Sequence, residues 1–204
     1  MERTITVHGT GTATASPDAV IISGGFSGLF ASYDEAVGAS SGILSSIRRE
    51  VVAAGFDAAD LKTVRVSVNP EYTYDKDGKS SFSGYRFNHD ISITEDSDGE
   101  TVGRVLGALV RCDGAPEFRL EYTVRDRSGP MAEARADAVA DARCKAEQLA
   151  DAAGVRLGEI VTIEYGSGCD AGRPVLRSVA CMNMDAVPDD MRFTDSVTIV
   201  WSIS

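Results

Sequence analysis

The stretch that decides the fold is KTVRVSVNPEYTYDKDGKSSFSGYRFNHDISIT, residues 62–94. Apolar and polar side chains alternate on both sides of a polar segment, and this period of two is typical of half-buried strands. The alternating positions are Val64, Val66, Val68, Tyr72 and Tyr74 before the polar segment, and Tyr85, Phe87, His89, Ile91 and Ile93 after it. With residues 75–83 as the turn, the stretch predicts a β-hairpin.

A helix is predicted on each side of this hairpin. Ser32 and Glu35 form a capping box before an apolar stripe of helical spacing, and Gly55 follows the stripe as a helix stop. We therefore expect the first helix at about 33–54. A second capping signature, Ser97-Asp98-Gly99-Glu100, precedes the next apolar stripe and predicts a helix at about 98–112.

One strand precedes the first helix and another follows the second, which gives the order βαββαβ of a ferredoxin-like core. The rest of the chain adds a strand before this core and a helix with two strands after it. The remaining elements are expected at 5–7, 20–26, 118–124, 129–153 (the long helix), 161–165 and 197–203. We predict an α+β fold with a mainly antiparallel mixed sheet covered by helices. Because no linker divides the chain, residues 1–204 are expected to form a single domain.

Composition limits the partners and the location of the protein. The formal net charge of -11 opposes contact with phosphates, so no nucleic-acid partner is expected. No apolar stretch reaches the roughly 20 residues that span a bilayer, so no membrane insertion is expected. Met1-Glu2-Arg3 runs directly into a strand pattern, so we expect a cytoplasmic protein with reduced thiols. A periplasmic or cell-envelope location is the alternative if an export signal has been removed.

The sequence contains no pattern of residues that is typical of an active site. It has no nucleophile elbow, which requires a serine on a sharp turn from a strand into a helix, and the glycines after the first strand lead into another strand rather than into a phosphate-binding helix. His8 and His89 fall on strands, where a structural histidine is the favoured interpretation. We therefore predict a non-enzymatic protein without a cofactor.

A long loop at 166–190 carries the sharpest local feature of the sequence. Its Cys169, Cys181, Met182 and Met184 offer thiol and thioether ligands of the kind that bind Cu(I) or form a redox switch. No C-x-x-C pair and no neighbouring histidine accompany them. Packing of the loop is therefore the favoured interpretation, and metal binding is the lesser one.

Two groups of residues are candidates for a protein interface. The first gathers around the hairpin and consists of Tyr72, Tyr74, Phe82 and Tyr85. Such rings suit an interface because they bury a large area at low entropic cost, although packing within the hairpin explains them equally well. The second group is a stripe of small residues on the long helix that includes Ala138 and Ala142. Contact with another subunit is one interpretation of this stripe, and packing on the protein's own sheet is the favoured one.

Short motifs along nearly the whole chain resemble those of the SIMPL family. They are Ile5-Thr6-Val7-His8-Gly9 with Gly11, Pro17-Asp18, Gly55-Phe56, Asp60-Leu61-Lys62-Thr63, Asn69-Pro70, Gly84-Tyr85 and, most specifically, the pattern within Ala138–Ala150 followed by Gly154 and Leu157-Gly158. The family includes bacterial periplasmic proteins linked to oxidative-stress defence and is named after a kinase-associated signalling protein. The resemblance implies ring-like or channel-like homo-oligomers and a stress-related role.

Three functions are compatible with these features. The leading interpretation is an oligomerising binding or scaffold protein whose protein partner the sequence does not identify. The second is a redox-responsive or soft-metal-responsive protein that uses the loop at 166–190. The third is a monomeric or dimeric signalling adaptor.

Overall fold

A computed structural model of the chain describes residues 3–76, 78–112, 117–166 and 189–204. Contacts divide these residues into two compact units. Unit 1 consists of the described residues of 1–17, 124–182 and 187–204, and unit 2 of those of 18–123. No helix in this described part of the chain is long and apolar enough to cross a membrane.

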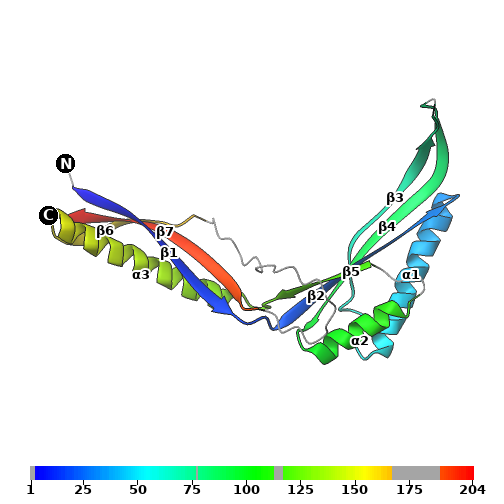
Figure 1. Cartoon of the computed structure of the whole chain (residues 1–204), viewed down its shortest axis with the longest axis horizontal. Helices are drawn as coiled ribbons and strands as arrows, with labels where there is room; N and C mark the ends of the chain where they lie inside the picture. The colour runs from blue at the N-terminus through cyan, green and yellow to red at the C-terminus, as the bar shows by residue number, and fades with distance from the viewer. Residues whose placement is uncertain (1–2, 77, 113–116, 167–188) are drawn as a thin grey trace. The chain divides into compact units, whose positions relative to one another are not determined.

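Unit 2 contains an antiparallel four-stranded sheet and two helices (Figure 1). Its elements are β2 (Ala19–Phe30), α1 (Tyr33–Ala53), β3 (Lys62–Tyr74), β4 (Ser80–Asp96), α2 (Gly99–Val110) and β5 (Glu117–Thr123). The strand order is β3-β4-β2-β5, and every neighbouring pair is antiparallel. Each helix thus connects two strands that have a third strand between them, which confirms the ferredoxin-like core and the α+β fold class.

Side chains at the start of each helix of unit 2 determine where it begins. The Ser32 hydroxyl accepts a hydrogen bond from the Glu35 N–H, and the Glu35 carboxylate accepts one from the Ser32 N–H. Asp98 caps α2 by accepting the N–H of Thr101, and this hydrogen bond lowers the pKa of the Asp98 carboxyl group. The capping box predicted at Ser32 and Glu35 is therefore formed, whereas the second signature caps α2 through Asp98 rather than through Ser97.

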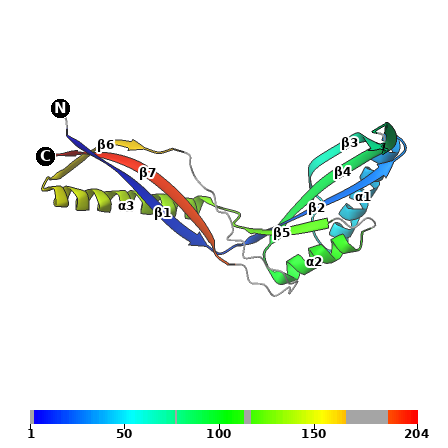
Figure 2. The same cartoon turned by 45° about the horizontal axis from the view of Figure 1, so that its top comes forward.

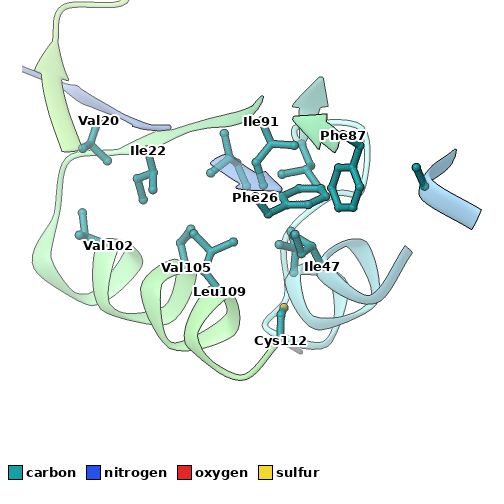
Figure 3. Close-up of a cluster of buried hydrophobic side chains, with 14 residues drawn as sticks. Val20, Ile22, Phe26, Ile47, Phe87, Ile91, Val102, Val105, Leu109 and Cys112 are labelled. Carbon is teal, nitrogen blue, oxygen red and sulfur yellow. The ribbon is translucent and has the colours of Figure 1, made fainter. Parts of the chain in front are cut away.

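Both helices contribute to the core of unit 2 (Figure 3). Residues from α1, α2 and the strands β2 and β4 meet there: Ile47; Val102, Val105 and Leu109; and Val20, Ile22, Phe26, Phe87 and Ile91. Phe87 and Ile91 are four positions apart, so they lie on the same face of β4. Both are buried, as the alternation within residues 62–94 predicted. Cys112 is buried in the same core, and its thiol donates a hydrogen bond to the Ala108 carbonyl oxygen at 3.3 Å.

Unit 1 contains a three-stranded antiparallel sheet and one long helix. Its elements are β1 (Thr4–Ala15), α3 (Ser128–Ala153), β6 (Leu157–Glu164) and β7 (Met191–Ile203), with the strand order β1-β7-β6. Figures 1 and 2 show α3 running alongside β1 and β7. The helix ends at Gly154, the residue that directly follows the predicted helix at 129–153, and Gly154 adopts the left-handed conformation typical of helix ends.

Small residues allow α3 to lie close to β1. Ala138 and Ala142 are fully buried in a cluster that includes Ile199 and Trp201 of β7. A Cβ atom on Gly11 of β1 would overlap the backbone of α3. The stripe of small residues therefore packs on the sheet of its own unit. The interface interpretation of Ala138 and Ala142 is corrected, because their side chains have no exposed surface left for another subunit.

The pairing of the first two strands also differs from the expectation of one extended sheet. β1 pairs with β7 along its whole length, from Thr4 opposite Ser202 to Ala15 opposite Met191, whereas β2 pairs with β4 and β5. Alternation predicts the two faces of a strand but does not specify its partner, so the presence of two separate sheets could not be predicted. That residues 1–204 form a single domain stays a prediction.

Candidate functional site

Aromatic side chains gather where the β3–β4 hairpin extends beyond β2. The last residue of β2, Phe30, pairs with Tyr85, and the hairpin continues from there to Tyr74 and Ser80 (Figure 1). The strands pair as far as these two residues, so β4 begins at Ser80, within the segment 75–83 that was predicted as the turn. This end of the hairpin is held by pairing between only two strands.

A β-bulge brings the aromatic rings onto one face. The register shifts between Glu71 and Tyr72, so that two residues of β4 are accommodated opposite one of β3. Gly84 takes a positive φ of 142°, and a Cβ atom there would overlap the Phe30 carbonyl oxygen. Only glycine fits this position, and the shift turns Phe82 toward the same side as Tyr85.

The rings form a continuous row of edge-on contacts. The ring centroids of Tyr72 and Phe82 lie 5.8 Å apart, those of Phe82 and Tyr85 5.3 Å, and those of Tyr85 and Tyr33 5.9 Å. Such T-shaped pairs are a favourable aromatic geometry. Tyr72 and Phe82 are nevertheless about half exposed, at 51% and 50%, and Tyr74 is 73% exposed. We call these four residues, Tyr33, Tyr72, Phe82 and Tyr85, together with the exposed Tyr74 at the end of β3, the aromatic row.

The charged groups of the hairpin balance one another. The Arg86 guanidinium donates two hydrogen bonds to the Glu71 carboxylate, one of them at 2.9 Å. These hydrogen bonds lower the pKa of Glu71 and raise the pKa of Arg86. Residues 70–86 contain three acidic side chains (Glu71, Asp75 and Asp77) and three basic ones (Lys76, Lys79 and Arg86). This segment is therefore neutral within a chain of net charge -11.

His89 is the second notable group of unit 2. It is buried on the helix side of β4, where Ser40 Oγ lies 2.9 Å from Nδ1 and Thr63 Oγ1 lies 3.1 Å from Nε2. Its ring stacks on Phe26 at a centroid distance of 4.8 Å. Burial lowers the pKa of His89, Asp90 opposes this effect, and Arg48 adds to it. The favoured interpretation of His89 as a structural histidine agrees with this setting.

A serine hydroxyl beside a histidine ring, as in Ser40 and His89, is also found in the active sites of serine hydrolases. In this protein a substrate has no access to the pair. Ser40 is only 4% exposed, so a substrate cannot reach its hydroxyl without separation of α1 from the sheet. A cavity of about 590 Å³ opens nearby, lined by residues that include Gly25, Phe26, Asp90 and Glu117. Asp90 in this cavity is already bound by Arg65 at 2.7 Å. His89 and Ser40 thus stabilise the packing of α1 on the sheet.

The remaining predicted residues lie apart from the aromatic row. His8 is exposed on β1 in unit 1, where Nδ1 lies 3.3 Å from Thr198 Oγ1. Cys169, Cys181, Met182 and Met184 lie outside the described residues, and their possible metal or redox role stays a prediction. Within the described ranges, no group of three or more His, Cys, Asp or Glu side chains is placed to hold a metal ion.

Sequence reasoning missed one polar cluster in unit 1. Asp195 is buried, and its carboxylate accepts hydrogen bonds from Arg135 Nε at 3.2 Å and from the Tyr165 hydroxyl at 2.9 Å. The Arg135 guanidinium also lies over the Tyr165 ring, 4.9 Å from its centroid. The signal that could have found this cluster is the register of β7. Asp195 falls between Phe193 and Val197 in the buried half of the alternation.

Similar proteins carry names that describe a location. The chain is 30% identical over 190 residues to the 26 kDa periplasmic immunogenic protein of Brucella melitensis, and the match covers 91% of the chain and 76% of that protein. The protein of the same name from Brucella abortus matches equally well. The uncharacterized protein YggE of Edwardsiella ictaluri is 32% identical over 112 residues, which cover 54% of the chain and 46% of YggE.

These relatives correct the expected location and confirm the family. The cytoplasmic location was wrong, because the most similar proteins named above are periplasmic. The cytoplasmic location was inferred from the first residues of the sequence, and these residues do not record whether a leader preceded them. The model of the SIMPL family, described as a protein of unknown function (DUF541), matches residues 5–201. The chain belongs to the SIMPL family.

Proposed function

We propose that this protein is a non-enzymatic periplasmic scaffold that assembles with copies of itself through the aromatic row. The periplasmic location is taken from the names of the two Brucella relatives. A stress-related role is proposed from the family resemblance alone. The observation that carries the assembly proposal is the half-exposed aromatic row at the end of the β3–β4 hairpin.

The aromatic row has the composition of an interface core. Tyrosine and phenylalanine are enriched at the centres of interfaces, where rings bury a large area and lose few rotamers. Tyr72, Tyr74 and Phe82 remain at least half exposed even though each lies on a strand. Their exposure leaves apolar area that a second molecule can cover.

Charge favours this end of the hairpin over other surfaces for self-association. Two molecules that each carry a net charge of -11 repel one another, and the repulsion is weakest where neutral segments meet. Residues 70–86 form such a segment, and Arg86 and Glu71 already neutralise each other within it. Added salt screens the repulsion between the remaining charges, so assembly is expected to strengthen with ionic strength.

The test is the solution mass by light scattering at low and high salt. We expect a defined multimer for the unaltered protein, and a smaller mass for the double variant Tyr72→Thr with Phe82→Thr. Threonine keeps the preference for strand structure, and loss of two central aromatic side chains is expected to weaken association about a hundredfold or more.

A matched control distinguishes this contact from general apolar attraction. Val110→Thr removes an apolar side chain that is 61% exposed at the end of α2. This variant is expected to keep the mass of the unaltered protein. A monomer at every salt and protein concentration would contradict assembly and favour the signalling adaptor.

A further inference from the structure

The sheet of unit 1 has two outer edges, and α3 closes one of them. The Asp141 carboxylate accepts a hydrogen bond from the backbone N–H of Thr10 at 2.8 Å, and Asp137 accepts one from Thr12 at 3.0 Å. Lys145 donates to the carbonyl oxygen of His8 at 3.3 Å. These side chains occupy the backbone groups of β1 that another strand would need for pairing.

The other edge is formed by β6 and has no such cover among the described residues. β6 pairs with β7 on one side and ends the strand order of the sheet. Ile160 and Ile163 of β6 are 51% and 55% exposed. An edge strand with exposed apolar side chains is a ready site for another chain, and proteins normally protect such edges. Side chains of α3 therefore cover the β1 edge of this sheet, whereas no described residue covers the β6 edge in this way.

A register shift in β6 places Ile160 and Ile163 on one face. Ile160 pairs with Trp201 and Ile163 with Ile199, and the register shifts between these two pairs. The shift places two residues that are three positions apart on the same side of the strand, next to the buried Trp201 and Ile199. Residues Thr162–Glu164 keep a regular register with β7, so the outer edge of this part is regular too.

One helix is too narrow to cover all three strands. An α-helix with its side chains is about 10 to 12 Å wide, whereas three strands about 4.8 Å apart present a wider face. α3 covers β1 and β7. A groove of about 290 Å³ is left beside β6, and its lining includes Val139, Arg143 and Glu147 of α3, Leu157 and Ile160 of β6, and Trp201. Arg143 and Glu147 form an ion pair with each other at 3.0 Å. Its volume is at the lower limit of small-molecule sites, which suits one or two side chains of a polypeptide better than a cofactor.

The acidic residues of β6 indicate the charge of a strand that could pair with its outer edge. Residues 157–166 contain Glu159 and Glu164 and no Lys or Arg. A second copy of β6 would bring two further carboxylates and no basic group to this edge, which is unfavourable. A strand that carries basic residues on both sides of apolar ones would instead pair its charges with these carboxylates.

We infer that the outer edge of β6 binds an extended peptide segment by strand addition. The segment has alternating apolar side chains, one of which enters the groove beside Trp201, and Lys or Arg on both flanks. Its backbone pairs with the regular edge at Thr162–Glu164, in the manner of other strand-addition sites. This site lies in unit 1 and does not involve the aromatic row.

A synthetic peptide tests this inference on the full chain. The probe is fluorescein-labelled Lys-Lys-Thr-Val-Thr-Val-Thr-Lys-Lys, titrated with protein and followed by fluorescence anisotropy and by Trp201 emission. Trp201 is the only tryptophan of the chain and lines the groove, so its emission reports occupation of this site. A peptide with proline in place of both valines has the same charge but cannot pair, and it controls for attraction to an acidic protein.

Matched variants locate the site. Ile160→Lys places a charge on the apolar face of β6 and is expected to weaken binding about tenfold or more. Leu149→Lys adds the same charge at a side chain of α3 that is also 51% exposed, and is expected to change binding less than twofold. Circular dichroism confirms that both variants remain folded.

Three results would overturn the inference. The first is equal binding of the valine and proline peptides, which would mean attraction by charge alone. The second is an equal loss of binding in Ile160→Lys and Leu149→Lys. The third is a peptide that does not bind while Ile160→Lys reduces the solution mass of the protein, which would assign the edge to a second copy of this chain.

Discussion

At the scale of single residues, His89 makes the stability of unit 2 dependent on pH. Both ring nitrogens are within hydrogen-bonding distance of hydroxyl oxygens, and burial lowers the pKa of the imidazole below its ordinary value. The unfolded chain therefore takes up this proton at a higher pH than the folded chain does. Neutral His89 contributes its full stability at any pH above the pKa of His89 in the unfolded chain. This stability decreases as the pH falls from that pKa toward the lower pKa of His89 in the folded chain.

Chemical denaturation at pH 7.5 and pH 5.0 checks this prediction. A single proton changes the free energy of unfolding by at most about 1.4 kcal/mol for each pH unit within the window. The difference between the two pH values should shrink in His89→Gln, which cannot take up the proton. Ser40→Ala keeps the histidine and serves as a comparison, so it should retain a pH dependence. An unchanged dependence in His89→Gln would assign the effect to other groups.

At the scale of elements, the contact between β1 and α3 depends on the absence of side chains. A Cβ atom on Gly11 would overlap the Ala134 carbonyl oxygen and the Ala138 amide nitrogen. Because both are helix backbone atoms, relief requires α3 to move away from β1. We expect Gly11→Ala to destabilise the protein by about 3 kcal/mol, measured by urea denaturation.

A second glycine-to-alanine change separates this packing effect from backbone entropy. Gly42 lies inside α1, and a Cβ atom there would meet nothing within 4 Å. Gly42→Ala should therefore leave stability unchanged or raise it by up to about 1 kcal/mol. A similar loss in both variants would show that close packing at Gly11 is not the cause.

At the scale of the whole molecule, the chain order links the two units. Unit 1 is built from both ends of the chain, and β1 pairs with β7 across the sequence of unit 2. The single-domain prediction requires the two units to unfold together. In denaturant, the emission of Trp201, which belongs to unit 1, should then follow the same transition as far-UV circular dichroism.

Native-state hydrogen exchange gives an independent check. Under one cooperative transition, the slowest amides of β7 and of β4 exchange with the same free energy of opening. Two separate values would contradict the single-domain prediction and make each unit a domain of its own.

Much of the local structure could be predicted from the sequence. Alternation within residues 62–94 predicted β3 and β4, and Ser32, Asp98 and Gly154 marked helix ends that the structure contains. The aromatic residues of the hairpin were also found, because large rings near a polar turn are visible without coordinates. These features depend on neighbours within a few positions of one another, where spacing and backbone preference are sufficient.

The sequence by itself therefore determined the helices, the strands, the βαββαβ order and the motifs of the SIMPL family. Only the tertiary structure decided that β1 pairs with β7, that Ala138 and Ala142 are covered, and that no strand among the described residues pairs with the outer edge of β6. Pairing joins residues far apart in sequence, and exposure depends on what packs on a face. Neither property is encoded in the local period of side chains, and both follow from contacts made only when the chain has folded.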